Sequence, residues 1–218
     1  MINIEVREYL APNGSCPFEE WLAGLRDRRA RNRILGRIDR LQAGLRGDWK
    51  AVGKGIFELR IDHGPGYRVY CGQDGSRLVL LLCVATSGPS NKTSRPHMSI
   101  GKTTKPAAAS RPFRASAYLR DETDIAAYLE SVLEDGDMRA VPVALRTVAE
   151  AMGGMAALAA RTGLSRETLY RTLSEKGNPR LDTLTAILTA FGLRLAVAPA
   201  SASLGIEPRA GAGAERSA

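Results

Sequence analysis

Apolar and polar residues follow two kinds of repeat in the first part of the chain. Residues 2–10 alternate as a strand does, and residues 16–45 carry apolar side chains at intervals of three and four, which is typical of two amphipathic helices. Short apolar runs follow at 56–62, 67–73 and 77–83, with turn sequences between them. The pattern predicts a helical hairpin packed on an antiparallel sheet, which is an α+β fold.

The pattern becomes helical from residue 113 onward. Residues 120–134 and 142–152 are amphipathic, and Pro142 suits the first turn of the second of these helices. Three further helices are predicted after residue 154, with Gly163 in a tight turn and Ser165 as the cap of the helix over 165–174. A last strand is predicted over 193–198. A helix, a glycine turn and a capped helix at this spacing predict an all-α helix-turn-helix domain.

The apolar run 77–83 leads directly into a stretch rich in Ser, Thr, Asn, Lys and Pro that has no strand or helix pattern. We therefore predict domains at 1–83 and 113–199, joined by a linker at 84–112 and followed by a disordered tail at 200–218. Neither a run of about 18 apolar residues nor a signal-peptide pattern is found. The sequence thus predicts a cytoplasmic protein with no membrane partner.

Charge is unevenly distributed along the chain. The formal net charge is +8, and residues 1–97 carry 16 Lys and Arg against 10 Asp and Glu. This excess favours a polyanionic partner such as a nucleic acid. Residues 121–137 hold seven acidic residues and no Lys or Arg. This acidic segment is predicted to bind the basic part of the chain or a separate basic partner, and the alternative is a solvated helix face.

Two stretches resemble known families. The string FELRIDHGPGYRVYCGQDGSRLVLLLC at 57–83, with the helices before it, resembles phage-derived addiction-module toxins of the RelE/HigB type. Residues 104–199, above all LSRETLYRTLSEKGNPRLDTL at 164–184, resemble HigA-type antidotes with a lambda-repressor-like helix-turn-helix. The resemblances imply that both partners of a type II toxin-antitoxin system lie in one chain.

The segment after Cys83 departs from the toxin pattern. Toxins of this type continue with a Gly-Gly-Asp-Lys segment and a terminal helix, and neither follows here. With one base restored after the Cys83 codon, the codons of residues 84–94 permit Gly-Gly-Asp-Lys followed by a run of Gln. We interpret residues 84–97 as out-of-frame, Met98 as the antidote's own start and the toxin domain as C-terminally truncated. The alternative is a true linker between deliberately fused partners.

The toxin resemblance implies a metal-independent RNase that cleaves messenger RNA on the ribosome. Such an enzyme needs basic groups on the scissile phosphate and a group that handles the 2′-hydroxyl proton. The candidates are Arg60, Arg68 and Tyr70 for catalysis, and Lys50 and Lys54 for RNA binding. The structural alternatives are an Arg60 ion pair with Asp62 or Glu58, and a core position for Tyr70. The pattern predicts no cofactor, metal or disulfide for Cys16, Cys71 and Cys83.

The helix over 166–174 is the predicted recognition helix. Arginine side chains there suit guanine edges or phosphates, and hydroxyls at the helix N-terminus suit a phosphate. The predicted DNA-binding residues are Thr162, Ser165, Arg166, Thr168, Tyr170, Arg171, Lys176 and Asn178. The alternative is a helix-turn-helix that serves only for packing or dimerisation.

Three functions follow as hypotheses. In the first, the antidote half binds operator DNA as a homodimer, through pairing of the strand at 192–198, represses its own transcription and neutralises a toxin, while the toxin half is inactive. In the second, an active RNase is inhibited in cis by its tethered antidote. In the third, the chain is an inert fusion.

Overall fold

The computed structural model describes residues 4–45, 47–53, 55–74, 77–86, 109–174, 176–197 and 199, with the side chains of 73–74 and 77–86 excepted. Predictions for the segment 87–108 and the tail 200–218 therefore lie outside the described residues. The N-terminal part contains β1 (Glu5–Tyr9), α1 (Pro17–Gly24), α2 (Arg28–Gln42), β2 (Trp49–Gly53), β3 (Ile56–Ile61), β4 (Tyr67–Asp74) and β5 (Arg77–Thr86). The C-terminal part contains β6 (Ser110–Pro112), η1 (Ala115–Tyr118), α3 (Glu122–Glu134), η2 (Met138–Ala140), α4 (Val141–Ala151), α5 (Gly154–Thr162), α6 (Arg166–Thr172) and α7 (Leu181–Ala190).

The described strands form one sheet in the order β2-β3-β4-β5-β1-β6. Strands β2 to β5 pair antiparallel in sequence order, β1 pairs parallel with β5, and β6 pairs antiparallel with β1. Strand β2 was not predicted, because four of its five residues are exposed and it carries no alternating apolar pattern. Mixed α and β structure followed by helices agrees with the predicted order of elements.

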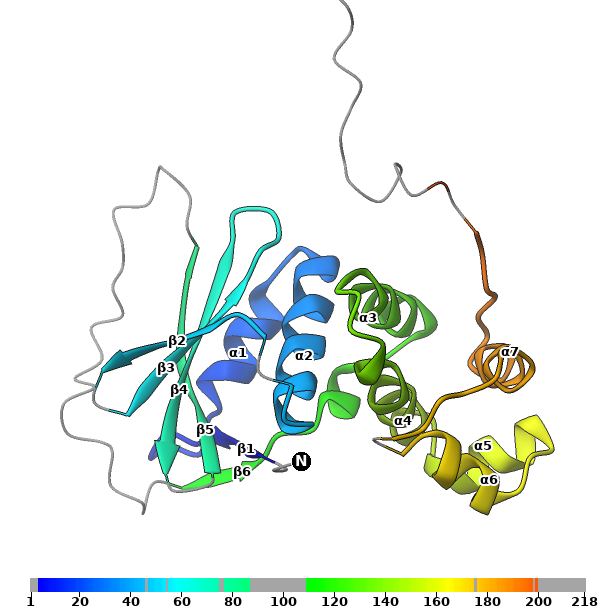
Figure 1. Cartoon of the computed structure of the whole chain (residues 1–218). Coiled ribbons are helices and arrows are strands. Elements are labelled where there is room, and N and C mark those ends of the chain that lie inside the picture. The colour runs from blue at the N-terminus through cyan, green and yellow to red at the C-terminus, as the bar shows by residue number, and fades with distance from the viewer. Residues whose placement is uncertain are drawn as a thin grey trace, which may run out of the picture.

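Helices α1 and α2 cover one face of the sheet (Figure 1). The core between these layers contains Leu22 and Ile34 from the helices and Leu59 and Val69 from the strands, all nearly inaccessible to solvent. Cys71 is a buried thiol in the same core, and burial raises its pKa to about 12. The other face of the sheet is therefore left for the polar residues of β2, β3 and β4.

The helices of the C-terminal part pack against the outer side of α2, so α2 lies between the sheet and α3 (Figure 1). Helices α5, α6 and α7 lie farthest from the sheet, beyond α4. No single helix of the described chain is long and apolar enough to cross a membrane, although the pair Met138–Ala151 and Gly154–Thr162 passes the length and composition test together, with a bend of 97° between its halves.

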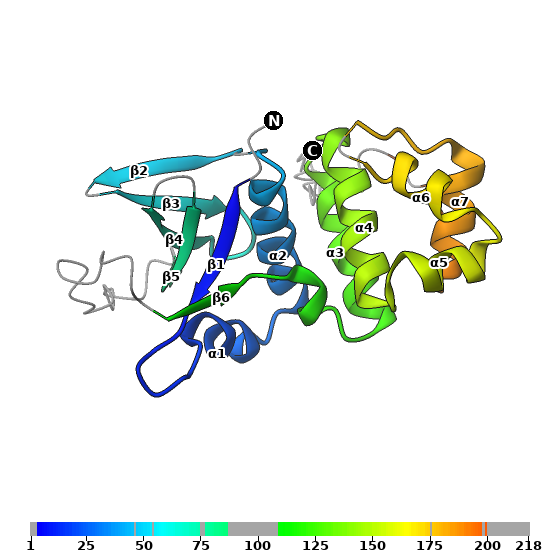
Figure 2. The same ribbon diagram turned by 90° about the horizontal axis from the view of Figure 1, so that it is seen from below.

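Strand β6 carries the C-terminal part onto the edge of the sheet, where it lies beside β1 (Figure 2). Arg111 donates hydrogen bonds of 2.6 Å from Nε to Glu8 and from an Nη atom to Glu19, and Tyr118 donates its hydroxyl to Glu8. Glu8 is only 2% exposed. Its buried carboxylate thus depends on two residues from a segment about a hundred positions away in sequence.

Replacement of Arg111 by Ala should lower the free energy of unfolding by about 2 kcal/mol, because it leaves the buried Glu8 carboxylate without its cation. This figure is below the range for fully buried pairs because Arg111 itself is 45% exposed. Urea denaturation followed by circular dichroism measures the change. Arg114→Ala removes an exposed arginine three residues along and serves as the matched control. Equal stability of the two variants would contradict a structural role for the Arg111–Glu8 pair.

Candidate nucleic-acid-binding sites

The register of β2, β3 and β4 gathers polar residues on the sheet face that the helices leave uncovered. Lys50 lies opposite Glu58, Glu58 lies opposite Tyr70, and Arg60 lies opposite Arg68. Directly opposed residues of neighbouring strands share a face. The structure therefore brings together the three predicted catalytic residues and one of the two predicted RNA-binding lysines.

Glu58 occupies the centre of this group and is only 4% exposed. Arg60 donates from Nε to Glu58 over 2.7 Å, and an Arg68 nitrogen lies 3.7 Å from the second carboxylate oxygen. Burial acts to raise the pKa of Glu58, but the hydrogen bond from Arg60 and the positive charges of Arg68 and Arg60 outweigh it, so the pKa lies below its ordinary value. The carboxylate is thus ionised at neutral pH and held between two guanidinium groups.

Tyr70 is the last member of the Glu58 cluster, which consists of Glu58, Arg60, Arg68 and Tyr70. The pKa of its phenol is raised, first by burial and next by the Glu58 carboxylate. The phenol is therefore protonated at neutral pH. A carboxylate, two guanidinium groups and a phenol are groups that can accept a hydroxyl proton, hold a phosphate and donate a proton.

From the sequence, Glu58 is predicted only as one possible ion-pair partner of Arg60, and the structure contains that ion pair. A sequence signal for its position exists, because residues two apart in a strand point to the same face. The pairing of Glu58 with Tyr70 and Lys50 could not be predicted from the sequence, because it depends on the register between strands. Lys54, the second predicted RNA-binding lysine, lies outside the described residues.

A second group of predicted residues surrounds the turn between α5 and α6. Gly163 adopts φ +70° and donates its backbone N–H to Ala159 over 3.0 Å, which ends α5. Ser165 accepts the Thr168 N–H over 3.1 Å and caps α6. The predicted glycine turn and serine cap are confirmed, and Leu169 is fully buried, which fixes the face that α6 turns to the core.

The outer face of α6 carries most of the predicted DNA-binding side chains. Arg166, Tyr170 and Arg171 are exposed, with Tyr170 at 56%, and Lys176 and Asn178 are exposed beyond the helix. The helix ends at Thr172, two residues before the predicted end.

The two predicted hydroxyls before the helix and Thr168 make local hydrogen bonds. Thr162 donates to Leu158 over 2.8 Å, and Ser165 donates to the partly buried Thr168 hydroxyl over 2.9 Å. These bonds hold the turn in place.

The strand predicted over 193–198 is not formed at 193–197, the part of it that the structure describes without a gap. A strand requires a hydrogen-bonded neighbour, and none of the described strands pairs with these residues. Leu195 and Val197 are exposed apolar residues, Val197 at 97%.

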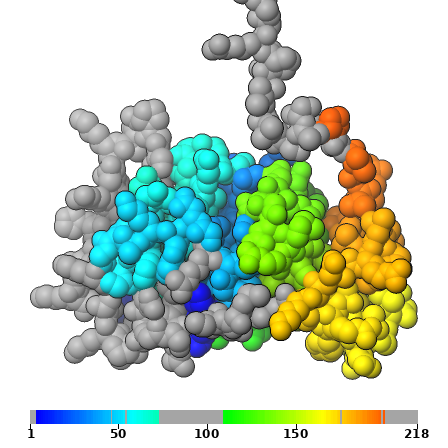
Figure 3. All heavy atoms as spheres, viewed as in Figure 1, coloured from blue at the N-terminus to red at the C-terminus, as the bar shows by residue number. Residues whose placement is uncertain are grey.

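The acidic segment, residues 121–137, lies along α2. Arg28 contacts Asp121 at 3.2 Å and Asp124 at 3.3 Å near the start of the helix, and Arg31 contacts Asp124 at 3.5 Å. Further along, Arg33 pairs with Glu134, and Arg40 pairs with Asp135 and Asp137. The space-filling view shows the green surface of α3 meeting the blue surface of α2 (Figure 3). The acidic segment therefore neutralises arginines along α2, and at its C-terminal end Asp135 lines a pocket together with Arg60 of the Glu58 cluster.

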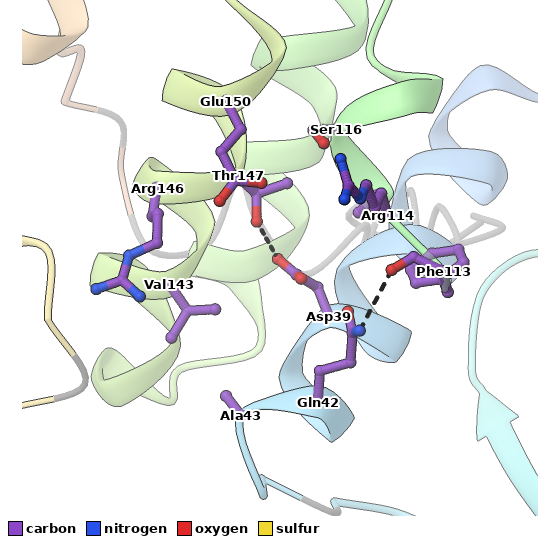
Figure 4. Close-up of a pocket in the computed structure, with 11 residues that line it drawn as sticks. Asp39, Gln42, Ala43, Phe113, Arg114, Ser116, Val143, Arg146, Thr147 and Glu150 are labelled. Carbon is purple, nitrogen blue, oxygen red and sulfur yellow. Dashed lines mark hydrogen bonds between the residues drawn. The ribbon is translucent and has the colours of Figure 1, made fainter. Parts of the chain in front are cut away.

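Buried polar contacts join α2 to α3 and α4. Asp39 accepts a hydrogen bond from the Tyr128 hydroxyl. It accepts another from Thr147 Oγ1 over 2.7 Å (Figure 4). Burial raises the pKa of Asp39 despite these donors. A pocket of about 250 Å³ lies beside these groups and is also lined by Arg146 and Glu150. The helices of the two parts thus meet in a packed interface with a hydrogen-bonded centre.

Comparison with known proteins adds three findings. Residues 109–199 match the profile of a family described as "Probable addiction module antidote protein". An uncharacterized protein of Haemophilus influenzae (strain ATCC 51907 / DSM 11121 / KW20 / Rd) is 54% identical over 66 residues, which is 30% of this chain and 67% of the relative. A second uncharacterized protein of that strain is 32% identical over 87 residues, which is 40% of this chain and 89% of the relative. No solved structure gives a significant match.

Proposed function

The chain belongs, through residues 109–199, to the family of probable addiction module antidote proteins, and from this premise we propose that it is an antitoxin that binds operator DNA and represses its own transcription. Family membership supports an antitoxin role and implies a cognate toxin partner. The proposal that the chain binds DNA rests on how α6 packs against the rest of the domain. Its cap and the buried Leu169 fix the helix, while Arg166, Tyr170 and Arg171 remain exposed for a major groove.

We propose a homodimer on a palindromic operator as the DNA-bound form, since one helix-turn-helix unit makes few contacts. The exposed Leu195 and Val197 support this proposal, because alternate apolar residues in an unpaired segment suit a strand that pairs with its copy across a two-fold axis.

The N-terminal part is proposed to be the toxin-like partner, with residues 1–83 as its domain and the acidic segment as the element that neutralises it. The ion pairs of α2 with Asp124, Glu134 and Asp135 support this assignment, as does the burial of Asp39 under α3 and α4. An intact toxin elsewhere in the cell is a second target of the same segment.

Footprinting with the purified full chain tests the proposed regulator. DNA upstream of its own coding sequence should be protected at an inverted repeat, and a reporter placed behind that DNA should be repressed when the chain is present. Absence of both protection and repression would overturn autorepression and leave only the family role.

A second candidate function, a metal-independent RNase, is favoured by the Glu58 cluster. An ionised carboxylate is suited to accept the 2′-hydroxyl proton, Arg60 and Arg68 to stabilise the charge on the phosphate, and Tyr70 to donate a proton to the leaving oxygen. In this reading the acidic segment lies away from the sheet face and leaves the cluster in place.

Replacement of Glu58 by Gln should slow cleavage of single-stranded RNA by the full chain at least about 100-fold, because the amide cannot accept the proton. Gel analysis of a labelled RNA, with chelator present, measures the rate. Glu20→Gln removes an exposed carboxylate of α1 and should leave the rate unchanged. Cleavage that survives Glu58→Gln would exclude this cluster as the site, and it would leave the DNA-binding proposal unaffected.

A further inference from the structure

A pocket of about 260 Å³ lies where the C-terminal half of α2 meets the end of β3. Its walls come from α2, the loop after it, β3 and the acidic segment. The lining residues are Arg33, Arg37, Arg40, Gly47, Asp48, Arg60, Ile61, Asp62 and Asp135. Four guanidinium groups from two elements therefore face three carboxylates in a small space.

The loop after α2 holds this pocket in shape. Arg37 donates to the Asp48 carbonyl over 2.8 Å, and Gly47 at φ +52° passes so close that a Cβ would lie 2.9 Å from the Arg37 guanidinium carbon. Burial, and next the charge of Arg40, lowers the pKa of Arg37 below its ordinary value. The pocket thus keeps buried positive charges close together.

One nitrogen of the Arg40 guanidinium group lacks a hydrogen-bond acceptor among the described residues. Its Nε is buried and has no hydrogen-bond partner within the described chain. Its remaining nitrogens pair with Asp135 and Asp137. A buried donor without an acceptor costs free energy, and an anion with several oxygens could accept from it.

Asp135 provides the pocket with an anion from the C-terminal part. With Asp135 in place the lining carries one positive charge in excess, and without it the excess is two. Arg33, on the same wall, pairs with the neighbouring Glu134. Two successive carboxylates thus pair with arginines of one helix, and phosphates of a nucleic-acid strand are anions that such arginines also bind.

Arg60 lines this pocket and also binds Glu58 on the sheet face. We propose that the pocket is a phosphate-binding subsite for a single-stranded RNA whose backbone continues from the Glu58 cluster around Arg60. Asp135 occupies this pocket, and Glu134 pairs with Arg33 on its wall, in place of RNA phosphates. This inference rests on the second proposed function, the RNase. The acidic segment is then a competitor for RNA binding at a subsite that adjoins the reacting groups and shares Arg60 with them.

Binding of a fluorescent 2′-O-methyl RNA ten nucleotides long to the full chain tests the proposal. This probe lacks the 2′-hydroxyl, so binding is measured without cleavage. The double variant Glu134→Gln/Asp135→Asn should bind it about tenfold more tightly than the unaltered chain, measured by fluorescence anisotropy at constant salt. Glu130→Gln removes an exposed carboxylate of the same helix and should change nothing.

Arginine variants in the same background identify the binding site. Addition of Arg33→Ala to the double variant should reverse the tighter binding, whereas Arg29→Ala, an exposed arginine at the start of α2, should not. An affinity unaffected by Glu134→Gln/Asp135→Asn would overturn the subsite. Equal tightening for a deoxyribonucleotide strand of the same sequence would show that the pocket binds the phosphates of either strand and would overturn the RNA assignment. Tight RNA binding without any cleavage of unmodified RNA would support the subsite and refute the RNase.

Discussion

The double variant Arg166→Ala/Arg171→Ala is expected to bind operator DNA about 100-fold or more weakly than the unaltered chain. Each arginine that contacts a guanine edge contributes about 1–3 kcal/mol, and the double variant removes both exposed arginines of α6 at once. Both side chains are exposed and cap no helix, so the fold should be unchanged. Electrophoretic mobility shifts with the protected DNA fragment measure the affinity.

Salt dependence separates base contacts from phosphate contacts in this experiment. Loss of a phosphate contact should reduce the slope of log affinity against log salt by about 1, whereas loss of a base contact should relax sequence preference. Arg26→Ala/Arg29→Ala removes two exposed arginines at and just before the start of α2, far from α6, and so controls for net charge. If Arg166→Ala/Arg171→Ala binds DNA as this control does, α6 is not the recognition helix.

The variant Gly36→Leu should separate the C-terminal helices from α2. Gly36 lies at the contact between α2 and α3, where a Cβ alone would approach Ser131 Oγ and Val132 Cγ2 to 3.2 Å. A leucine side chain cannot fit unless α3 moves, and overpacking of this kind costs about 3 kcal/mol at the upper end of its usual range. Within α2 itself leucine is a better helix former than glycine, so the helix should remain.

Hydrogen exchange detects this separation. Amides of α3 and α4 should lose about 100-fold in protection, while those of α2 and β3 should change little. Gly36→Ala should give a smaller loss, and Gly24→Leu, at the open end of α1, should give none. Unchanged protection in Gly36→Leu would mean that packing of α3 on α2 does not hold the two parts together.

Separation of the two parts also tests the proposed neutralisation of the N-terminal part by the acidic segment. Tethering keeps the acidic segment at high effective concentration, so modest ion pairs suffice to keep α2 covered. Gly36→Leu should therefore act in the same direction as Glu134→Gln/Asp135→Asn on RNA binding, although it changes no charge. This agreement would connect the packed interface to the arginine pocket.

Local sequence patterns predicted most of the helices and strands and the candidate site residues. Periodicity placed the strands and helices, because amphipathic repeats record which face each element buries. Gly163 and Ser165 marked the turn and the cap, since both act on the backbone a few residues away. The arginines of β3 and β4 were found because residues two apart share a strand face.

Features that depend on pairing between distant segments were found in the folded chain and not in the local patterns. Strand β2 carries no apolar alternation, and β6 consists of three residues in a segment predicted as a linker, so both are strands because of their neighbours. Register placed Glu58 beside Tyr70, and folding brought Asp135 to Arg40 across about a hundred positions. Contacts between distant residues produce no periodic pattern in a single sequence. Within its own segment, each partner has the pattern of an ordinary exposed charged residue.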